Sequence, residues 1–246
     1  MHTEVDLRAN RLLSLLPADE LARIAPLLET IDGRDHDVLY APGDDMSFAY
    51  FPLNGVCSLI ATDAAGDGVE MASVGREGMV GLPGALDGSR MIGEVVQQIS
   101  GRLARIATAD LRLEIERRGV LSEVTERYAV ALLSAIGQGV VCNRYHPVES
   151  RAARWLLASH DRVGSDSFRL TQDFLATMLG VTRPQVSLAA ATLRRAGFIT
   201  YRRGDMQIID RGGLEETSCE CYAVLRDEFE RLLGGGNGHA WTPVGG

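Results

Sequence analysis

Residues Gln172 to Ala191 read QDFLATMLGVTRPQVSLAAA, and they decide the fold of the C-terminal part of this 246-residue chain. Ala176 offers a small side chain where a second helix would cross the first closely. Gly180 can adopt the left-handed conformation that ends a helix. Thr182 can cap a second helix, and Pro184 fits its first turn, where no backbone N–H is required. The stretch predicts a helix-turn-helix, a motif typical of DNA binding; an ordinary helical hairpin is the alternative.

The N-terminal end of the predicted second helix presents polar side chains, and in such motifs this end meets base edges in the major groove. We expect Arg183 to contact guanine and Gln185 to contact adenine, because these side chains pair bidentately with those bases. We expect threonine hydroxyls and arginines around the motif to bind phosphates. The predicted DNA-binding residues are Thr171, Gln172, Thr182, Arg183, Gln185, Ser187, Arg202 and Arg203.

The segment from Thr200 to Ile209 reads as strand, turn and strand, which predicts a winged helix. Two arginines at its turn can reach the phosphate backbone. The whole chain has a net charge of −8, but seven arginines and four aspartates between Ser165 and Arg211 give that segment a charge of +3. Because binding depends on the cations near the phosphates, the acidity of the whole chain does not exclude DNA.

The composition is ordinary for a soluble globular protein, with 46% hydrophobic and 24% charged residues. No apolar run approaches the roughly 20 residues of a membrane span, and the N-terminus lacks a signal-peptide pattern, so we expect a cytoplasmic protein. The four cysteines, at positions 57, 142, 219 and 221, are typical of free thiols. Metal binding by Cys219 and Cys221 with Cys142 is conceivable. No second close pair completes a structural zinc pattern, so we expect no metal and no cofactor.

Short β-prone runs separated by glycine-rich turns fill the chain from Ile31 to about Ile106, after two short amphipathic helices rich in leucine. Many short strands at this spacing predict a β-sandwich or β-roll. The expected strands lie at residues 37–40, 49–51, 56–60, 69–74, 94–99 and 102–106.

A short helix is predicted over residues 109–118, and a long one from Leu121 to about Tyr145. The long helix carries a coiled-coil-like seam at alternating three- and four-residue steps, with further apolar residues beside it. Such a helix needs a second apolar surface, so we predict a parallel homodimer through it; burial within the monomer is the alternative. The predicted dimer-interface residues are Leu121, Val124, Tyr128, Ala131, Ala135, Gln138 and Cys142.

Pro147 ends the long helix and places a domain boundary near His146–Pro147. We expect a sensor domain over residues 1–118 and a dimerisation helix over 119–146. A winged helix-turn-helix domain follows over 147–233, and its last helix is predicted over about 214–233. The glycine-rich tail 234–246 cannot bury enough surface to order itself, which predicts disorder.

Two short helices, a glycine-punctuated β-roll, a long helix and a winged helix-turn-helix together resemble the cyclic AMP receptor and fumarate-nitrate regulator (Crp/Fnr) superfamily. The resemblance extends to Tyr40–Asp44, to Val74–Gly81 at the phosphate-cassette position, and to Arg183. It implies an α+β fold: a cyclic-nucleotide-binding-like β-roll, a dimerisation helix and a C-terminal winged helix-turn-helix. It also implies a homodimeric transcription regulator on a two-fold DNA site, with RNA polymerase as a partner.

The predicted effector pocket departs from the cyclic-nucleotide-binding members. They carry glycine-glutamate-leucine where this chain has Gly78, Met79 and Val80, and an arginine-serine or arginine-threonine pair where it has Met91 and Ile92. A cyclic phosphate needs a charged partner, so cyclic AMP is disfavoured. Arg90 lies one residue out of register and leaves a cyclic-nucleotide-responsive regulator as an alternative.

Other readings have less support in the sequence. The iron-sulfur sensors have an N-terminal cysteine cluster, whereas the first cysteine here is Cys57; haem stays open, and the effector is unknown. The glycines near position 78 lack a Walker lysine, and His36, His146 and His160 have no catalytic partner at motif spacing, so we expect no enzyme. An effector-binding or protein-interaction module that no longer reads DNA is the remaining alternative.

Overall fold

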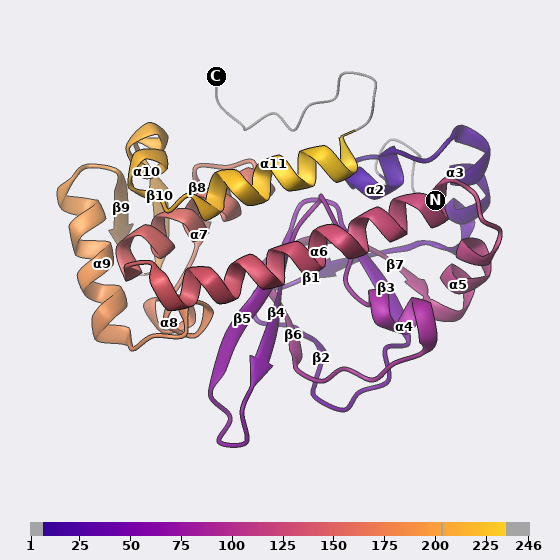
Figure 1. The fold of residues 1–246 in the computed structure, drawn as a ribbon, viewed down its shortest axis with the longest axis horizontal. Coiled ribbons are helices and arrows are strands. Elements are labelled where there is room, and N and C mark those ends of the chain that lie inside the picture. The colour runs from indigo at the N-terminus through magenta and orange to yellow at the C-terminus, as the bar shows by residue number, and fades with distance from the viewer. Residues whose placement is uncertain (1–6, 203, 235–246) are drawn as a thin grey trace.

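The structure, a computed structural model, describes residues 7–202 and 204–234 (Figure 1). A helical N-terminal segment leads into a β-roll, a long helix crosses the molecule, and a second α+β unit follows. This arrangement confirms the predicted fold class. The N-terminal segment contains α2 (Arg11–Ser14), α3 (Ala18–Ile24) and a 3-10 turn, η1 (Ala25–Leu27).

The roll consists of two antiparallel sheets, with strand orders β1-β7-β3 and β2-β6-β4-β5. Every predicted run is a strand, but β1 was not predicted, because its residues mix polar with apolar types and exposed with half-buried positions. Helix α4 (Leu82–Asp87) lies between the fifth and sixth strands. The strands are β1 (Glu29–Gly33), β2 (Val38–Tyr40), β3 (Phe48–Pro52), β4 (Val56–Thr62), β5 (Gly68–Val74), β6 (Glu94–Ile99) and β7 (Gly101–Ala107).

Two helices leave the roll, α5 (Thr108–Glu116) and the 26-residue α6 (Val120–Tyr145), close to their predicted bounds. Side chains of distant segments fix α6 in place. The Glu20 carboxylate accepts hydrogen bonds from the N–H groups of Val120 and Leu121, at 2.9 and 3.0 Å, and so satisfies donors that a helix start leaves free. Tyr128 donates its hydroxyl to the Met79 carbonyl at 2.8 Å, which ties α6 to the roll.

The C-terminal unit begins with α7 and contains a three-stranded sheet of order β8-β10-β9. The predicted boundary near His146–Pro147 falls between α6 and α7. Strand β8 was not predicted, because three residues carry too little pattern. The elements are α7 (Val148–Val163), β8 (Ser167–Arg169), α8 (Gln172–Leu179), α9 (Arg183–Arg195), β9 (Ile199–Arg202), β10 (Asp205–Ile208), α10 (Arg211–Thr217) and α11 (Cys221–Leu233).

The prediction of one last helix over 214–233 was wrong, because α10 and α11 are separate helices. Ser218 leaves the helical conformation, with φ −64° and ψ 154°, and its hydroxyl donates to the Glu215 carbonyl at 2.9 Å. Asp210 caps the start of α10 by accepting from the Gly213 N–H at 3.0 Å. Because of this break, α11 does not continue along the axis of α10.

Helix α11 runs beside α6 back to the N-terminal segment (Figure 1). There the Arg11 guanidinium forms an ion pair with Glu230 at 2.8 Å and donates to the Leu233 carbonyl at 3.1 Å. The Leu233 side chain is buried in the same hydrophobic cluster as Leu12 and Leu21. The two ends of the described chain therefore share one core.

The roll and the C-terminal unit also share a core. Helix α8 packs on β5, so closely that a Cβ atom at Gly180 would lie 2.9 Å from a methyl carbon of Val69. The shared hydrophobic cluster includes Val56, Ile60, Val96 and Ile99 from the roll with Trp155, Phe168 and Leu175 from the C-terminal unit. None of the helices in the described ranges is long and apolar enough to cross a membrane.

Candidate DNA-binding surface and sensor cavity

Helices α8 and α9 form the helix-turn-helix that the sequence predicts. Thr171 caps α8 by accepting a hydrogen bond from the Phe174 N–H at 3.1 Å. Gly180 ends α8 with φ +58°, a conformation that glycine adopts without the penalty of a Cβ atom. The Val181 N–H then bonds to the Ala176 carbonyl at 3.0 Å, which confirms the predicted position of the turn.

A capping box begins α9. The Gln185 side-chain oxygen accepts hydrogen bonds from the Thr182 N–H at 2.9 Å and from the Thr182 hydroxyl at 3.0 Å. Pro184 lies in the first turn. The predicted cap is confirmed, and Gln185, predicted as an adenine reader, has its oxygen engaged inside the protein.

The exposed face at the start of α9 carries Arg183, whose side chain is 64% exposed. Its guanidinium lies 3.4 Å from the Asp173 carboxylate, and a pair this exposed contributes little, so the arginine can exchange it for another partner. Ser187 is half-buried and donates to the Gln172 side-chain oxygen at 2.7 Å, which links α9 to α8. The buried face of the motif consists of Leu175, Ala176, Leu179, Val186, Ala189 and Leu193.

The wing is the hairpin of β9 and β10, in which Arg202 is opposite Asp205. The Tyr201 hydroxyl donates to the Leu170 carbonyl at 2.8 Å and fixes the hairpin to the body of the domain. Arg202 is exposed, as are Thr171 and Thr182 beside the two helix starts. Arg203, the other predicted wing contact, lies outside the described residues.

The six predicted effector-pocket residues do not surround one cavity. Met79 and Val80 are buried in the core, and Gly78 packs against the Tyr128 ring. Arg90 and Ile92 lie on the surface, with Arg90 73% exposed and paired with Asp45 at 2.9 Å. Met91 is buried between these two surface residues. The roll places this segment at its surface. That position depends on contacts between residues far apart in the sequence, so counting residues along the chain could not predict it.

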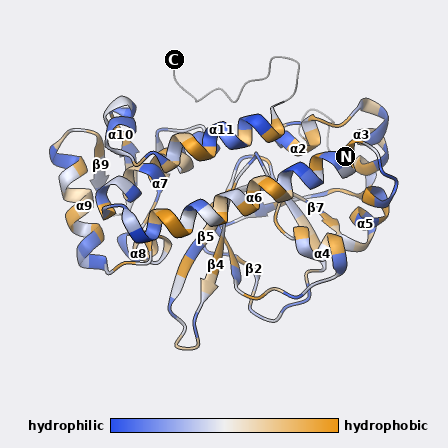
Figure 2. Ribbon diagram, in the orientation of Figure 1, coloured by the Kyte–Doolittle hydropathy of each residue, from blue (hydrophilic) through white to orange (hydrophobic). Residues whose placement is uncertain are grey.

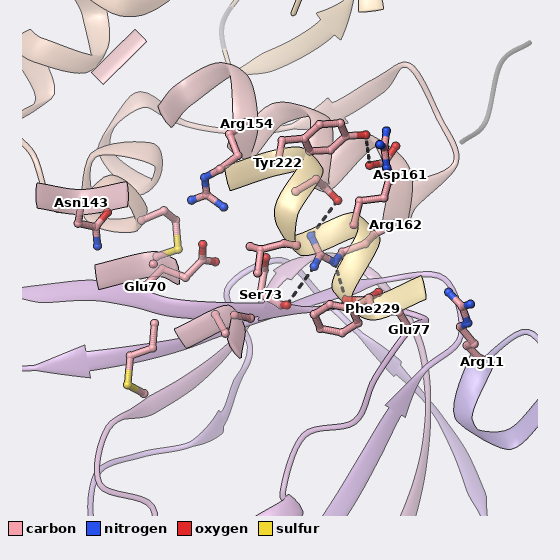
Figure 3. A pocket seen from close by; sticks show the side chains of 18 residues that line it. Arg11, Glu70, Ser73, Glu77, Asn143, Arg154, Asp161, Arg162, Tyr222 and Phe229 are labelled. Carbon is pink, nitrogen blue, oxygen red and sulfur yellow. Dashed lines mark hydrogen bonds and ion pairs between the residues drawn. The ribbon is translucent and has the colours of Figure 1, made fainter. Parts of the chain in front are cut away.

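A cavity of about 100 Å³ lies instead between the roll and the C-terminal unit. Figure 3 shows side chains from β5, α6, α7 and α11 around it. It contains none of the predicted effector residues. Pockets for drug-sized ligands measure about 300 to 1,000 Å³, so in this conformation the cavity is too small for a nucleotide. Its polar lining includes Glu70, Ser73, Glu77, Asn143, Arg154, Asp161, Arg162 and Tyr222.

Buried charges around the cavity are held by specific partners. Arg162 pairs with Glu77 at 2.7 Å and donates to the Ser73 carbonyl at 3.3 Å (Figure 3). Burial opposes the charge of Arg162, but Glu77 outweighs it and raises the pKa of that guanidinium. Burial raises the pKa of Asp161, although the Tyr222 hydroxyl donates to it at 2.8 Å. The contacts of Arg162 with Glu77 and Ser73 join the roll to the C-terminal unit, whereas Asp161 and Tyr222 both lie within that unit.

The surface of α6 corrects the predicted dimer seam. Of its seven residues, Leu121, Val124, Tyr128, Ala131 and Cys142 are buried within the chain itself, and Ala135 and Gln138 are half-buried. A repeat of three and four residues marks a buried face, but it does not say whether the chain or a partner covers it. The exposed apolar stripe is Val130, Leu133, Val140 and Val141, and Figure 2 shows hydrophobic residues along the whole helix.

Four potential metal ligands meet where α6 ends. The ligand atoms of Cys142, His146, Cys219 and Cys221 all lie within 4.8 Å of one another. The sequence did not predict a metal site here, because it has no second close cysteine pair and His146 stands alone at motif spacing. The available signal was the four-residue step from Cys142 to His146, which places both on one face of a helix.

Comparison with known proteins places these features in context. Residues 150–217 match the family of Crp-like helix-turn-helix domains. A search of curated proteins found no match. The structure is similar to a Crp/Fnr-family transcriptional regulator from Eubacterium rectale, with TM-score 0.65 and 15% identity over 84% of this chain and 96% of that one.

Two further solved structures resemble about three quarters of the chain. FixK2 from Bradyrhizobium japonicum has a TM-score of 0.63 and 15% identity, over 78% of this chain and 98% of that one. A CRP-family transcriptional regulator from Thermus thermophilus has a TM-score of 0.64 and 16% identity, over 76% of this chain and 96% of that one. At these identities the likeness establishes a shared fold, including the roll and the long helix.

Proposed function

The chain has the fold of the Crp/Fnr transcription regulators with a Crp-like helix-turn-helix domain, and from this architecture we propose that it is a homodimeric, sequence-specific DNA-binding transcription regulator. The observation that carries the proposal is the start of α9. There a capped helix end presents Arg183 to solvent, while Val186, Ala189 and Leu193 of the same helix are buried in the domain core. A helix start of this kind enters the major groove in helix-turn-helix complexes.

In this proposal Arg183 contacts guanine, after exchanging its exposed pair with Asp173 for a bidentate pair with the base. Thr171, Thr182 and Arg202 bind phosphates, supported by the two helix starts, whose free N–H groups favour anions. Gln185 reads adenine only if it releases Thr182, so its contribution is smaller than that of Arg183. Gln172 and Ser187 keep their mutual hydrogen bond and orient the two helices.

The proposed dimer pairs two copies of α6 in parallel through the exposed stripe of Val130, Leu133, Val140 and Val141. These four apolar side chains are exposed in the single chain, and a second copy would bury them. Such a dimer would place two reading heads about 34 Å apart on a two-fold DNA site, where RNA polymerase is the further partner.

The sensor domain is proposed not to respond to cyclic AMP. Met91 and Ile92 carry no charge for the cyclic phosphate, and Arg90 lies on the surface, where its side chain is 73% exposed. Calorimetric titration of the purified protein with cyclic AMP and cyclic GMP tests this. The expected result is no heat of binding at micromolar ligand; binding in that range would show that Arg90 moves into the roll.

Selection of a preferred site from a random DNA pool, followed by binding measurements on Arg183→Ala, tests DNA reading. We expect the variant to lose about 1 to 3 kcal/mol of affinity for the preferred site and to tolerate changes at one base pair. Arg117→Ala is the matched control, because Arg117 is an exposed arginine directly after α5, far from the helix-turn-helix in the sequence. Equal losses in both variants would contradict the contact, and a wild type that selects no sequence would indicate an interaction module.

A further inference from the structure

The cluster of Cys142, His146, Cys219 and Cys221 has the dimensions of a site for a single metal ion. Cys142 Sγ lies 3.6 Å from Cys219 Sγ, and Cys221 Sγ lies 3.4 Å from His146 Nδ1. In a tetrahedral zinc site the ligands lie about 2.3 Å (sulfur) and 2.0 to 2.1 Å (nitrogen) from the ion, so two sulfurs are separated by about 3.8 Å and a sulfur and a nitrogen by about 3.6 Å. The two measured separations lie close to those values.

The fold brings these ligands together from two places far apart in the sequence. Cys142 lies in the last turn of α6, and His146 follows it by four residues, with its N–H bonded to the Cys142 carbonyl at 3.2 Å. Cys219 lies in the break between α10 and α11, and Cys221 is the first residue of α11. All three cysteines are buried in one cluster, which excludes water from the sulfur atoms.

Neighbouring groups are placed as the outer partners of a metal site. His146 Nε2 lies 3.0 Å from the Glu220 carboxylate, so the ring can donate a proton there while Nδ1 faces the sulfurs. A carboxylate behind a histidine ligand in this way fixes the ring and strengthens the ligand. The Gln138 amide donates to Cys221 Sγ at 3.0 Å, which stabilises negative charge on that sulfur.

Two arginines close to the cluster would balance the charge of the site with its ion bound. Three thiolates, one neutral histidine and a divalent cation carry a net charge of −1. Arg151 and Arg154 both interact electrostatically with the cysteines and offset that charge. The start of α11 adds the positive end of a helix dipole.

We propose that Cys142, His146, Cys219 and Cys221 form a structural zinc site that fastens the start of α11 to the end of α6. Four protein ligands close the coordination sphere, which is typical of structural rather than catalytic zinc. The site lies where the long helix meets the C-terminal unit. Zinc there would hold α11 in the position from which it reaches Arg11 at the other end of α6.

Two experiments on the full-length protein test this proposal, and neither depends on DNA binding. Elemental analysis of protein purified without a metal-affinity tag should give one zinc per chain. After removal of zinc with a chelator under reducing conditions, titration with Co²⁺ should produce the visible bands of a tetrahedral thiolate complex, with an end point at one equivalent.

Single substitutions test which side chains bind the ion. Cys142→Ser and Cys219→Ser should each weaken zinc binding by at least about 100-fold, and Glu220→Gln should weaken it by about 10- to 100-fold while retaining the ligands. Cys57→Ser is the matched control, because Cys57 is also a buried cysteine but lies in the roll beside Gln97, outside the cluster. It should keep one zinc per chain.

Several outcomes would overturn the proposal. The first is a wild type that contains less than about 0.1 zinc per chain and shows no cobalt bands. The second is a loss of metal in Cys57→Ser that equals the loss in the cluster variants. The third is a protein that contains iron with acid-labile sulfide in place of zinc. Mass spectrometry showing a disulfide between Cys142 and Cys219 in freshly purified protein would also exclude it. The Glu220 side chain is largely exposed, so we expect Glu220→Gln to fold. This variant therefore still tests zinc binding if the cysteine variants fail to fold.

Discussion

At the scale of single residues, Glu70 shows how the inside of this molecule differs from its surface. The carboxylate is half-buried between the roll and α7, where the Ser58 hydroxyl donates to it at 2.7 Å and the Trp155 indole N–H at 3.0 Å. Burial raises the pKa of Glu70 above its usual value of 4.5, although these donors and two arginines oppose that shift. The charged form is therefore unfavourable in the folded state.

We expect Glu70→Gln to raise the free energy of unfolding near pH 7. The folded state holds the Glu70 proton to a higher pH than the unfolded state, so stability is lost as the pH rises from about 4.5 through the raised pKa. Each pKa unit corresponds to about 1.4 kcal/mol, so the difference in unfolding free energy between the two proteins measures the size of the shift. The amide can accept from Trp155 and donate to the Ser58 oxygen, which leaves the single proton of that hydroxyl for Gln98.

Urea unfolding at a series of pH values measures this effect. The wild type should lose more stability above pH 4.5 than the variant, and the exposed Glu116→Gln should behave like the wild type. If Glu70→Gln is less stable at every pH, its hydrogen bonds to Ser58 and Trp155 outweigh the cost of its charge.

Local chemistry explains which single residues the sequence could predict. Thr171, Gly180 and Thr182 were placed correctly, because a cap and a left-handed turn depend on residues within a few positions. The surface position of Arg90 was not predictable, since it depends on how the roll folds this segment. His146 was missed as a ligand, because Cys221 lies 75 positions further along the chain.

At the scale of elements, α6 shows what periodicity can and cannot determine. Its length and its start were predicted closely, because apolar residues recur at helical spacing over the whole segment. The face that a partner covers was not predictable, because α11 and the roll bury the most regular seam. The break between α10 and α11 was also missed, because Ser218, Cys219 and Glu220 carry no proline or glycine signal.

We expect Leu133→Glu to convert the proposed dimer to a monomer. Leu133 is 69% exposed in the single chain, and at the centre of the proposed stripe a carboxylate would have to enter an apolar interface without a partner. Sedimentation velocity measures the change. Leu113→Glu is the control, because Leu113 is a similarly exposed leucine on α5. If Leu133→Glu sediments as a dimer, α6 does not pair through this stripe.

At the scale of the whole molecule, the sensor and the C-terminal unit form a continuous structure. Ile60 and Val96 of the roll pack in the same cluster as Trp155 and Phe168. Residue patterns predicted two parts and a boundary, because each part has its own periodicity. The contact between the parts was not predictable, since it joins surfaces that lie about 100 residues apart in the sequence.

We expect the full chain to unfold in one cooperative transition. Loss of the shared core would expose both parts together, so neither should melt alone. Calorimetry measures this through the ratio of calorimetric to van't Hoff enthalpy. Ile60→Ala should lower stability by about 2 to 5 kcal/mol and shift the entire transition. Two separate peaks, with only the first one moved by Ile60→Ala, would show that the parts unfold independently.

The closure of Leu233 onto the N-terminal core also constrains how the protein is made. The hydrogen bond from Arg11 to Leu233 spans 222 positions. The core around the N-terminal helices is therefore complete only after α11, the last helix, has been synthesised. Contacts of such long range slow folding, because a long chain must close on itself before they form. A ribosome that stops before α11 emerges leaves leucines near the N-terminus uncovered, and such a fragment becomes a target for chaperones and proteases.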